Sequence, residues 1–287
     1  MRLMQLACAK LMNELDKRCR ALGIDYWFAY GTLIAALSRH GFIPWDDDID
    51  ICMIREDIER LRSSLLDDPL CQVTLVYDWY PPCRQIRFCF KDQRIPCFID
   101  LSVYDWARDA SKAHDDAFRE LRLDLMSEIH GSNDFPYWKS RGYLVAERSG
   151  HVVQAGPIDF SEQDVNKAGS EMPKIEGVFA SYSERAYEQG ILCGKEEATA
   201  VAYAIDNTYD APWRRTLWPN EMIFPTHECP FESYAFLVPN KAFDVADECY
   251  PGWPYLPEDI LLGHEHFSRE ILSDDAVRKA IEEVLAS

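Results

Sequence analysis

The sequence lacks any long apolar run. No window of the 287 residues approaches the roughly 18 apolar residues that a membrane-spanning helix needs. Charged residues, among them Lys10, Glu14 and Asp16, interrupt the N-terminal stretch, which therefore lacks the apolar centre of a signal peptide. Repeats and low-complexity linkers are also missing. We expect a chain that meets a membrane, or a lipid-linked partner, only by peripheral contact.

Basic residues are scarce relative to acidic ones. The chain has 30 Lys and Arg against 49 Asp and Glu, which gives a formal net charge of -19. Nucleic-acid binding draws most of its affinity from basic side chains that neutralise phosphates, so a nucleic-acid partner is disfavoured. A nucleotide substrate remains compatible with this balance, because a divalent cation held by carboxylates can supply positive charge locally.

Paired cysteine motifs are absent too. The ten cysteines include no CxxC pair, and many have apolar neighbours. This pattern indicates mostly reduced core thiols, so we expect a cytoplasmic protein that works at the inner face of the membrane if its acceptor is lipid-linked. Zinc held by His227, Cys229 and scattered cysteines is disfavoured because structural zinc sites usually show paired ligand spacing, but it stays open. His264 and His266 are disfavoured as a metal pair because histidines at i and i+2 on a helix diverge.

Apolar residues, at 47%, are plentiful enough for a substantial core. We predict an α+β fold with a mixed sheet flanked by helices, in a single domain over 1–287 with a mainly helical insertion at about 106–210. Apolar spacing predicts helices at about 3–22, 32–38, 55–66, 108–130, 241–249 and 274–286. Runs of β-forming residues predict strands at about 24–30, 84–90 and 95–104, and Gly, Ser and Pro predict loops within 131–174.

An acidic run, Asp-Asp-Asp-Ile-Asp at residues 46–50, is the most informative feature. If it forms a strand, Asp46, Asp48 and Asp50 lie on one face and Ile49 and Ile51 on the other. The carboxylates would then converge while the isoleucines enter the core. Converging carboxylates can hold the metal ions that neutralise charge in phosphoryl or nucleotidyl transfer.

A third carboxylate, Asp100, lies in the apolar setting Phe98-Ile99-Asp100-Leu101. An unpaired carboxylate would be costly to bury there, and a bound cation would relieve that cost. A solvated acidic face is the plain alternative, since charge runs usually lie on surfaces. A calcium loop is disfavoured because Ile51 stands where the loop needs glycine and Asp57 where it prefers glutamate.

A longer pattern surrounds the acidic run. The segments Tyr30–Leu33 and Arg39–Ile51 closely resemble the signature of the LicD family, which is related to fukutin and belongs to the DNA polymerase beta-like nucleotidyltransferase superfamily. Phe98–Leu101, Pro230–Glu232 and Tyr250–Pro257 are similar to further elements of that family in the same order. Tyr250-Pro251-Gly252 departs from the family's Tyr-Gly-Asp triplet and removes one acid.

The resemblance implies a nucleotidyltransferase-like fold and a Mg²⁺- or Mn²⁺-dependent transferase. The implied reaction moves phosphocholine, or a related phospho-alcohol, from CDP-choline or another CDP-alcohol to a sugar hydroxyl of a cell-surface glycan, and releases CMP. The acceptor would be a glycan or lipid-linked glycan, as in lipopolysaccharide or teichoic acid modification. In this scheme Asp48 and Asp50 bind the metal, Asp46 is an outer ligand, and Asp100 holds a second metal or acts as general base.

The donor phosphate would bind at Gly31 and Thr32, because a helix start suits anions. Arg39 precedes the acidic run and could pair with phosphate oxygens in fork geometry, although a surface role is about equally expected. Glu232 is a further site candidate because glutamate is seldom buried without a partner. Arg84 and Arg87 are weaker candidates.

Two other functions stay open. The first is transfer of NMP from an NTP to a small molecule or protein, since fold does not fix function. The second is a catalytically silent glycan- or choline-binding protein. Aromatic rings can hold a quaternary ammonium, although most rings here are expected to pack loops onto the core. The rings considered are Trp79, Tyr80, Trp213, Trp218, Trp253 and Tyr255.

Overall fold

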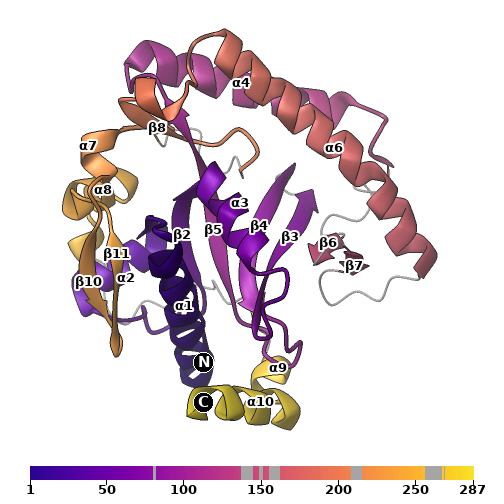
Figure 1. Ribbon diagram of the computed structural model, residues 1–287, viewed down its shortest axis with the longest axis vertical. Helices are drawn as coiled ribbons and strands as arrows, with labels where there is room; N and C mark the ends of the chain where they lie inside the picture. Colours follow the sequence, from indigo (N-terminus) through magenta and orange to yellow (C-terminus); the bar gives the residue numbers. More distant parts are fainter. Residues whose placement is uncertain are drawn as a thin grey trace. The chain divides into compact units, whose positions relative to one another are not determined.

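The computed structural model describes residues 1–79, 82–136, 145–148, 151–154, 162–207, 215–255, 267 and 269–287 of the chain. They divide into two units. The first contains Met1–Val73, Arg87–Leu101 and Glu221–Ser287, and the second contains Thr74–Ile86 and Ser102–Asn220. Helices and a mixed set of strands make up both units, so the predicted α+β class is confirmed (Figure 1).

The first unit is built on five strands in the order β1-β2-β5-β4-β3, the last three of which continue into the second unit. Their bounds are β1 Tyr26–Phe28, β2 Ile49–Ile54, β5 Phe98–Ala107, β4 Pro82–Phe90 and β3 Cys71–Trp79. The helices of this unit are α1 Arg2–Leu22, α2 Tyr30–Arg39, α3 Arg55–Ser64, α7 Asn220–Ile223, α8 Ala242–Cys249, α9 Arg269–Ser273 and α10 Asp275–Ala286. A separate antiparallel hairpin joins β10 His227–Phe231 to β11 Tyr234–Val238.

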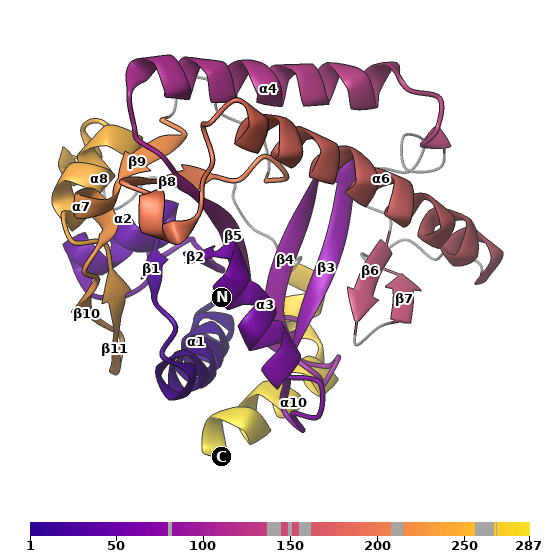
Figure 2. The same ribbon diagram turned by 45° about the horizontal axis from the view of Figure 1, so that its top comes forward.

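Helix α1 packs against α3 and α10, and α2 packs against β2, β10 and α8 (Figure 2). Gly23 ends α1 in the left-handed conformation, at φ 62°, as its position after the apolar stripe predicts. Strand β1 pairs antiparallel with β2 in a register that places Phe28 opposite Ile51. The end of β1, the start of α2 and the start of β2 therefore lie together.

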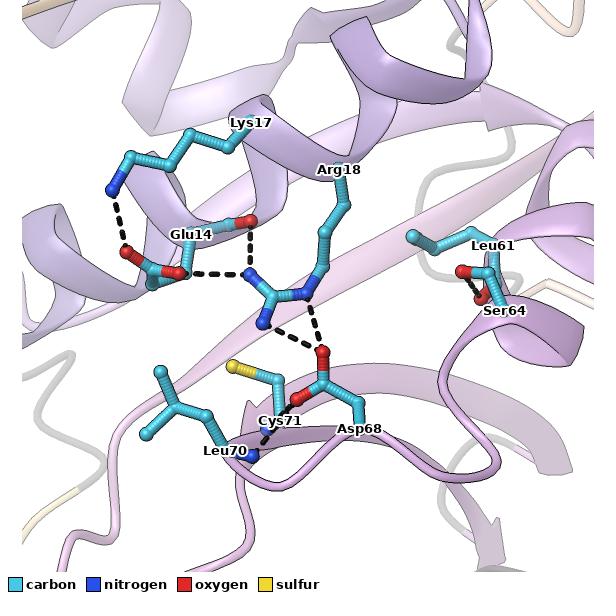
Figure 3. A network of polar contacts seen from close by, with 8 residues as sticks. All are labelled: Glu14, Lys17, Arg18, Leu61, Ser64, Asp68, Leu70 and Cys71. Carbon is cyan, nitrogen blue, oxygen red and sulfur yellow. Dashed lines mark hydrogen bonds and ion pairs between the residues drawn. The ribbon is translucent and has the colours of Figure 1, made fainter.

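A polar network fastens α1 to the loop before β3 (Figure 3). The guanidinium of Arg18 donates to Glu14 Oε2 at 2.8 Å and to Asp68 Oδ2 at 2.7 Å. The other oxygen of Asp68 accepts from the amides of Leu70 and Cys71, both at 2.8 Å. Although burial raises the pKa of Asp68, these amides and Arg18 hold it below its ordinary value.

We expect Asp68→Asn to lower the free energy of unfolding by about 1–2 kcal/mol at pH 7, because the new amide group would face Arg18 as a second donor. Because the folded-state pKa of Asp68 is depressed, the ionised carboxylate makes its full contribution to the free energy of unfolding above the ordinary pKa of 3.8. It is lost as the pH falls through the folded-state pKa. Urea unfolding at pH 7 and pH 3 would check this, with the exposed neighbour Asp67→Asn as control. An equal loss at both pH values would contradict the assignment.

The second unit carries two long helices, α4 Lys112–Gly131 and α6 Glu162–Glu188, which pack against each other. Strand β6 (Val145–Arg148) pairs with β3 at Thr74–Tyr77 and with β7 (His151–Gln154). Strand β8 (Ala200–Tyr203) pairs with β5 at Tyr104–Ala107 and with β9 (Leu217–Pro219). The predicted single domain with an insertion at about 106–210 stays a prediction.

Most predicted elements are confirmed, and two differences have clear causes. The prediction of loops within 131–174 is wrong at β6 and β7, and again from Glu162 onward, where Met172, Ile175 and Phe179 give α6 a buried stripe that outweighs Pro173 in its interior. Strand β3 lies outside the predicted elements. Its residues 71–77 are all buried, the polar Gln72 and Thr74 included, so exposure does not alternate along it as in a strand with one solvated face.

None of the helices among the described residues is long and apolar enough to cross a membrane. The ten cysteines are free thiols, eight buried and two half-buried.

Candidate metal and phosphate site

The acidic run lies where a loop enters the sheet of the first unit. The Asp46 amide donates to the Ile43 carbonyl at 3.0 Å, which closes a turn, and β2 begins only at Ile49. The prediction that Asp46 shares a strand face with the later aspartates is therefore wrong, because this turn keeps residues 46–48 outside the ladder. Ile49 and Ile51 are buried as predicted and anchor the strand.

Three carboxylates meet at the start of β2. One oxygen each of Asp48, Asp50 and Asp100 lies within 4.8 Å of the others, with Asp48 buried and the other two half-buried. Asp46, Asp47 and Asp48 form a second such group, so Asp48 belongs to both. Like charges this close repel one another, and a cation removes that repulsion. An all-carboxylate donor set suits a hard cation such as Mg²⁺ or Mn²⁺, so these residues fit the expected metal.

Burial and hydrogen bonds give Asp47 a structural role. Its side chain is fully buried and accepts a hydrogen bond from the Phe267 amide at 3.2 Å, and its carbonyl accepts one from the Cys8 thiol at 3.4 Å. A hydrogen bond with Cys97, together with burial, raises the pKa of the Cys8 thiol, which stays neutral beside the acidic run. Asp47 therefore anchors the run, while Asp48 and Asp50 face Asp100.

The first turn of α2 lies against the acidic run. A Cβ added to Gly31 would lie 3.2 Å from Asp46 Oδ2, so glycine permits this close approach. The Asp50 amide donates to Thr32 Oγ1 at 2.9 Å, and the Ala29 amide donates to the Asp50 carbonyl at 3.1 Å. The buried Thr32 hydroxyl thus ties α2 to β2. The first amides of α2 have no partner within the helix, as at any helix start, which suits an anion there.

Arg39 ends the same helix. At 1.5 Å per residue, its Cα lies about 12 Å along the axis from that of Gly31. The predicted phosphate-binding set therefore occupies two ends of one helix. Its joint role stays a prediction; Gly31 lies beside Asp46, and the Thr32 hydroxyl accepts from the Asp50 amide.

Arg87 is in the site, although the sequence ranks it low. Its Nε donates to Asp100 Oδ1 at 2.9 Å, and its guanidinium lies 3.8 Å from the centre of the Phe98 ring. Arg87 therefore holds one of the three converging carboxylates. Arg84 belongs to the second unit, where it pairs with Glu176 at 2.6 Å and with Asp206.

Glu232, at the tip of the β10–β11 hairpin, approaches the loop that leads into the acidic run. Its carboxylate accepts from Arg2 at 2.9 and 2.6 Å and from the Phe42 amide at 3.3 Å. The hydrogen bonds from Arg2 lower the pKa of Glu232. Sequence reasoning selects Glu232 without its partner, because 230 positions separate the two residues.

Helix α1 also supplies contacts that the sequence does not reveal. Gln5 Nε2 donates to the carbonyls of Ile43 at 3.2 Å and Asp46 at 2.8 Å. The one signal that could have found it is a polar residue adjoining the apolar stripe of this helix. Gln5 is only 4% exposed, so its amide needs partners.

The zinc and aromatic-ring candidates of the sequence analysis lie only partly within the described residues. Among the described residues, the groupings of carboxylates, thiols and imidazoles that could hold a metal are the two aspartate groups, so His227 and Cys229 form none. Trp218 is buried, and Trp253 is buried and donates to Asp247 Oδ1 at 2.7 Å, whereas Tyr255 is exposed. His264, His266, Tyr80 and Trp213, together with the Trp79 side chain, lie outside the described residues.

Comparisons with known proteins agree with this location. Residues 23–79 match the LicD/FKTN/FKRP nucleotidyltransferase domain. The lipopolysaccharide cholinephosphotransferase LicD of Haemophilus influenzae is 32% identical over 113 residues, which cover 35% of this chain and 43% of that protein. An uncharacterized protein of Rickettsia typhi is 38% identical over 197 residues, 68% of this chain and 54% of its own length.

The chain thus spans about half the length of these two curated relatives. The family match contains the first turn of α2 and the whole acidic run, which carry most of the site described above. This match and the Haemophilus influenzae relative support membership of the LicD family.

Proposed function

We propose that this chain transfers phosphocholine, or a related phospho-alcohol, from a CDP-linked donor to a sugar hydroxyl of a surface glycan. The observation that carries the proposal is the meeting of Asp48, Asp50 and Asp100 beside the first turn of α2. The Haemophilus influenzae relative supports the chemistry, since its name describes cholinephosphate transfer involving lipopolysaccharide.

In the proposed reaction the acceptor oxygen attacks the phosphorus that bears the alcohol. A new P–O bond forms, the bond to the bridging oxygen of the diphosphate breaks, and CMP leaves with that oxygen. Asp48 and Asp50 would hold Mg²⁺ or Mn²⁺, which supplies charge neutralisation at the reacting phosphate. The proton of the acceptor hydroxyl passes to Asp100 or, if Asp100 is a further metal ligand, to solvent.

The first turn of α2 would orient the donor. Its leading amides, at Gly31 and Thr32, can donate to phosphate oxygens. The hydrogen bond from the Asp50 amide to Thr32 Oγ1 then links the donor-binding turn to a metal ligand. This link holds donor and metal in one geometry, and such fixed placement is a major part of catalysis of phosphoryl transfer.

Within this proposal, an acceptor carried on a lipid would be met by peripheral contact at the cytoplasmic face. This location belongs to the proposal.

A second candidate is transfer of NMP from an NTP, which the nucleotidyltransferase description of the matching family favours. The two reactions leave different products. A CDP-alcohol donor yields CMP, whereas an NTP donor yields pyrophosphate.

The proposal is tested by incubating the chain with Mg²⁺, a glycan acceptor and CDP-choline, CDP-ethanolamine, CDP-glycerol or CDP-ribitol in turn. We expect one donor to release CMP and to raise the melting temperature in the presence of metal. Pyrophosphate release from an NTP instead would support the second candidate. Absence of both products and of any thermal shift would favour a silent binding protein.

A further inference from the structure

We infer that Glu232 and Arg2 form a latch that positions the acidic run and so sets the affinity of the site for its metal ion. The inference rests on the proposed metal site and concerns residues outside it. We call residues 41–46, between α2 and the acidic run, the entry loop. Glu232 is a positioning residue in this scheme, because it acts on the loop and touches neither metal nor substrate.

The backbone conformation of Glu232 is unusual for a glutamate. Phe231 pairs with Tyr234, so Glu232 and Ser233 form a two-residue hairpin turn, and Glu232 has φ 54°. Turns of this length favour glycine or asparagine at such a position, so a glutamate there is strained. A residue held in this conformation is typical of functional positions. In return, the Glu232 amide donates to the His40 carbonyl at 2.7 Å, directly before the entry loop.

The carboxylate of Glu232 occupies the space beside Gly41. A Cβ added to Gly41 would lie 2.7 Å from Glu232 Oε1, closer than any van der Waals contact allows. The same oxygen accepts from the Phe42 amide at 3.3 Å. Arg2, whose side chain is 58% exposed, donates one hydrogen bond to each oxygen of this carboxylate, at 2.9 and 2.6 Å, and so orients it.

The entry loop is held at further points. Gln5, one helical turn from Arg2, binds the carbonyls of Ile43 and Asp46. The ring of Phe42 packs edge-on against Phe231, with 4.9 Å between centroids. Helix α1 and the β10–β11 hairpin thus hold the loop at both of its ends.

This arrangement reaches the metal site through the chain itself. The entry loop ends at Asp46, a member of one of the two carboxylate groups, and no regular secondary structure separates it from Asp48. Freedom in the loop therefore reaches Asp46 directly, and Asp48 only across the anchored Asp47. If the loop is already ordered before the metal binds, binding does not have to offset the entropy cost of ordering its backbone. Loss of the latch should therefore weaken metal binding while leaving the metal ligands in place.

The test is direct titration of Mn²⁺, followed by electron paramagnetic resonance of the free ion, at a temperature where every variant is folded. We expect Glu232→Ala to raise the dissociation constant for Mn²⁺ about tenfold. Glu232→Gln, which keeps an acceptor for the Phe42 amide, should have a smaller effect. At saturating Mg²⁺ the turnover of both variants should recover.

The chain offers a matched control in Glu228. This residue lies on the same hairpin and pairs with Arg20 of the same helix at 2.9 Å, but the ion pair is exposed and lies away from the entry loop. Glu228→Ala therefore removes one α1–hairpin ion pair without touching the loop. We expect it to leave the dissociation constant for Mn²⁺ unchanged.

Gly41→Ala tests the latch by a second route, because the added methyl group would displace the Glu232 carboxylate. It should raise the dissociation constant as Glu232→Ala does. Gly194→Ala is its control, since nothing lies within 4 Å of a Cβ there. If Glu232→Ala proves unstable, Arg2→Ala and Gly41→Ala decide the question.

The inference is overturned if Glu232→Ala, Arg2→Ala and Gly41→Ala all bind Mn²⁺ as tightly as the unmodified chain. It is also overturned if the control Glu228→Ala weakens Mn²⁺ binding as much as Glu232→Ala does. Failure of the proposed metal site is a different result. In that case Asp48→Asn, too, would leave Mn²⁺ binding unchanged.

Discussion

Replacing Asp48 with asparagine is expected to reduce CMP release by about a thousandfold. Asp48 is common to both groups of converging carboxylates, so the substitution removes a charged ligand from each. Metal-assisted charge neutralisation stabilises a transition state by several kcal/mol, and each 1.36 kcal/mol is a factor of ten in rate. CMP release at saturating donor and Mg²⁺ is the measurement, with Mn²⁺ titration as a readout independent of turnover.

The control for this experiment is Asp67→Asn, the same chemical change at an exposed position in the loop before β3. It should leave both readouts unchanged. The free energy of unfolding of the Asp48→Asn chain should equal or exceed that of the unmodified chain, because the substitution relieves repulsion between carboxylates. Undiminished CMP release from this variant would remove the proposed mechanism.

Asp100→Asn is expected to have the second largest effect, a loss of about a hundredfold or more in turnover. Its carboxylate meets those of Asp48 and Asp50, and Arg87 fixes its orientation. The measurement separates its two possible roles. If Asp100 is a metal ligand, its replacement should raise the dissociation constant for Mn²⁺ as well as lower turnover. If Asp100 is the general base, its replacement should lower turnover and leave Mn²⁺ binding unchanged.

Asp92→Asn is a fitting control, because Asp92 lies in the turn that joins β4 to β5 and forms an exposed ion pair with Arg94. It should retain full turnover and metal affinity. Full turnover in Asp100→Asn as well would exclude both roles for Asp100 and leave only Asp48 and Asp50 in the proposed mechanism.

Local patterns predicted much of the first unit. Apolar spacing predicted α1, and Gly23 marked its end in the left-handed conformation. Alternation of aspartate with isoleucine predicted β2 from Ile49 onward, because one face of that strand enters the core. It failed at Asp46, since the turn closed by the Ile43 carbonyl depends on backbone hydrogen bonds that side-chain patterns do not record.

The sequence by itself determined which chemistry this protein can carry. The acidic run, the glycine-threonine pair before it and Asp100 are residue types suited to metal and phosphate, and a pattern long enough to mark a family surrounds them. Such features are local, because neighbouring residues and short periods determine them.

Only the tertiary structure decided which residues support the residues of the proposed site. It brought Arg87 to Asp100, Arg2 to Glu232 and Gln5 to the entry loop. The last two contacts join residues 38 or more positions apart. Contacts of this kind follow from how helix and hairpin pack around a shared core, and no pattern of neighbouring residues encodes them.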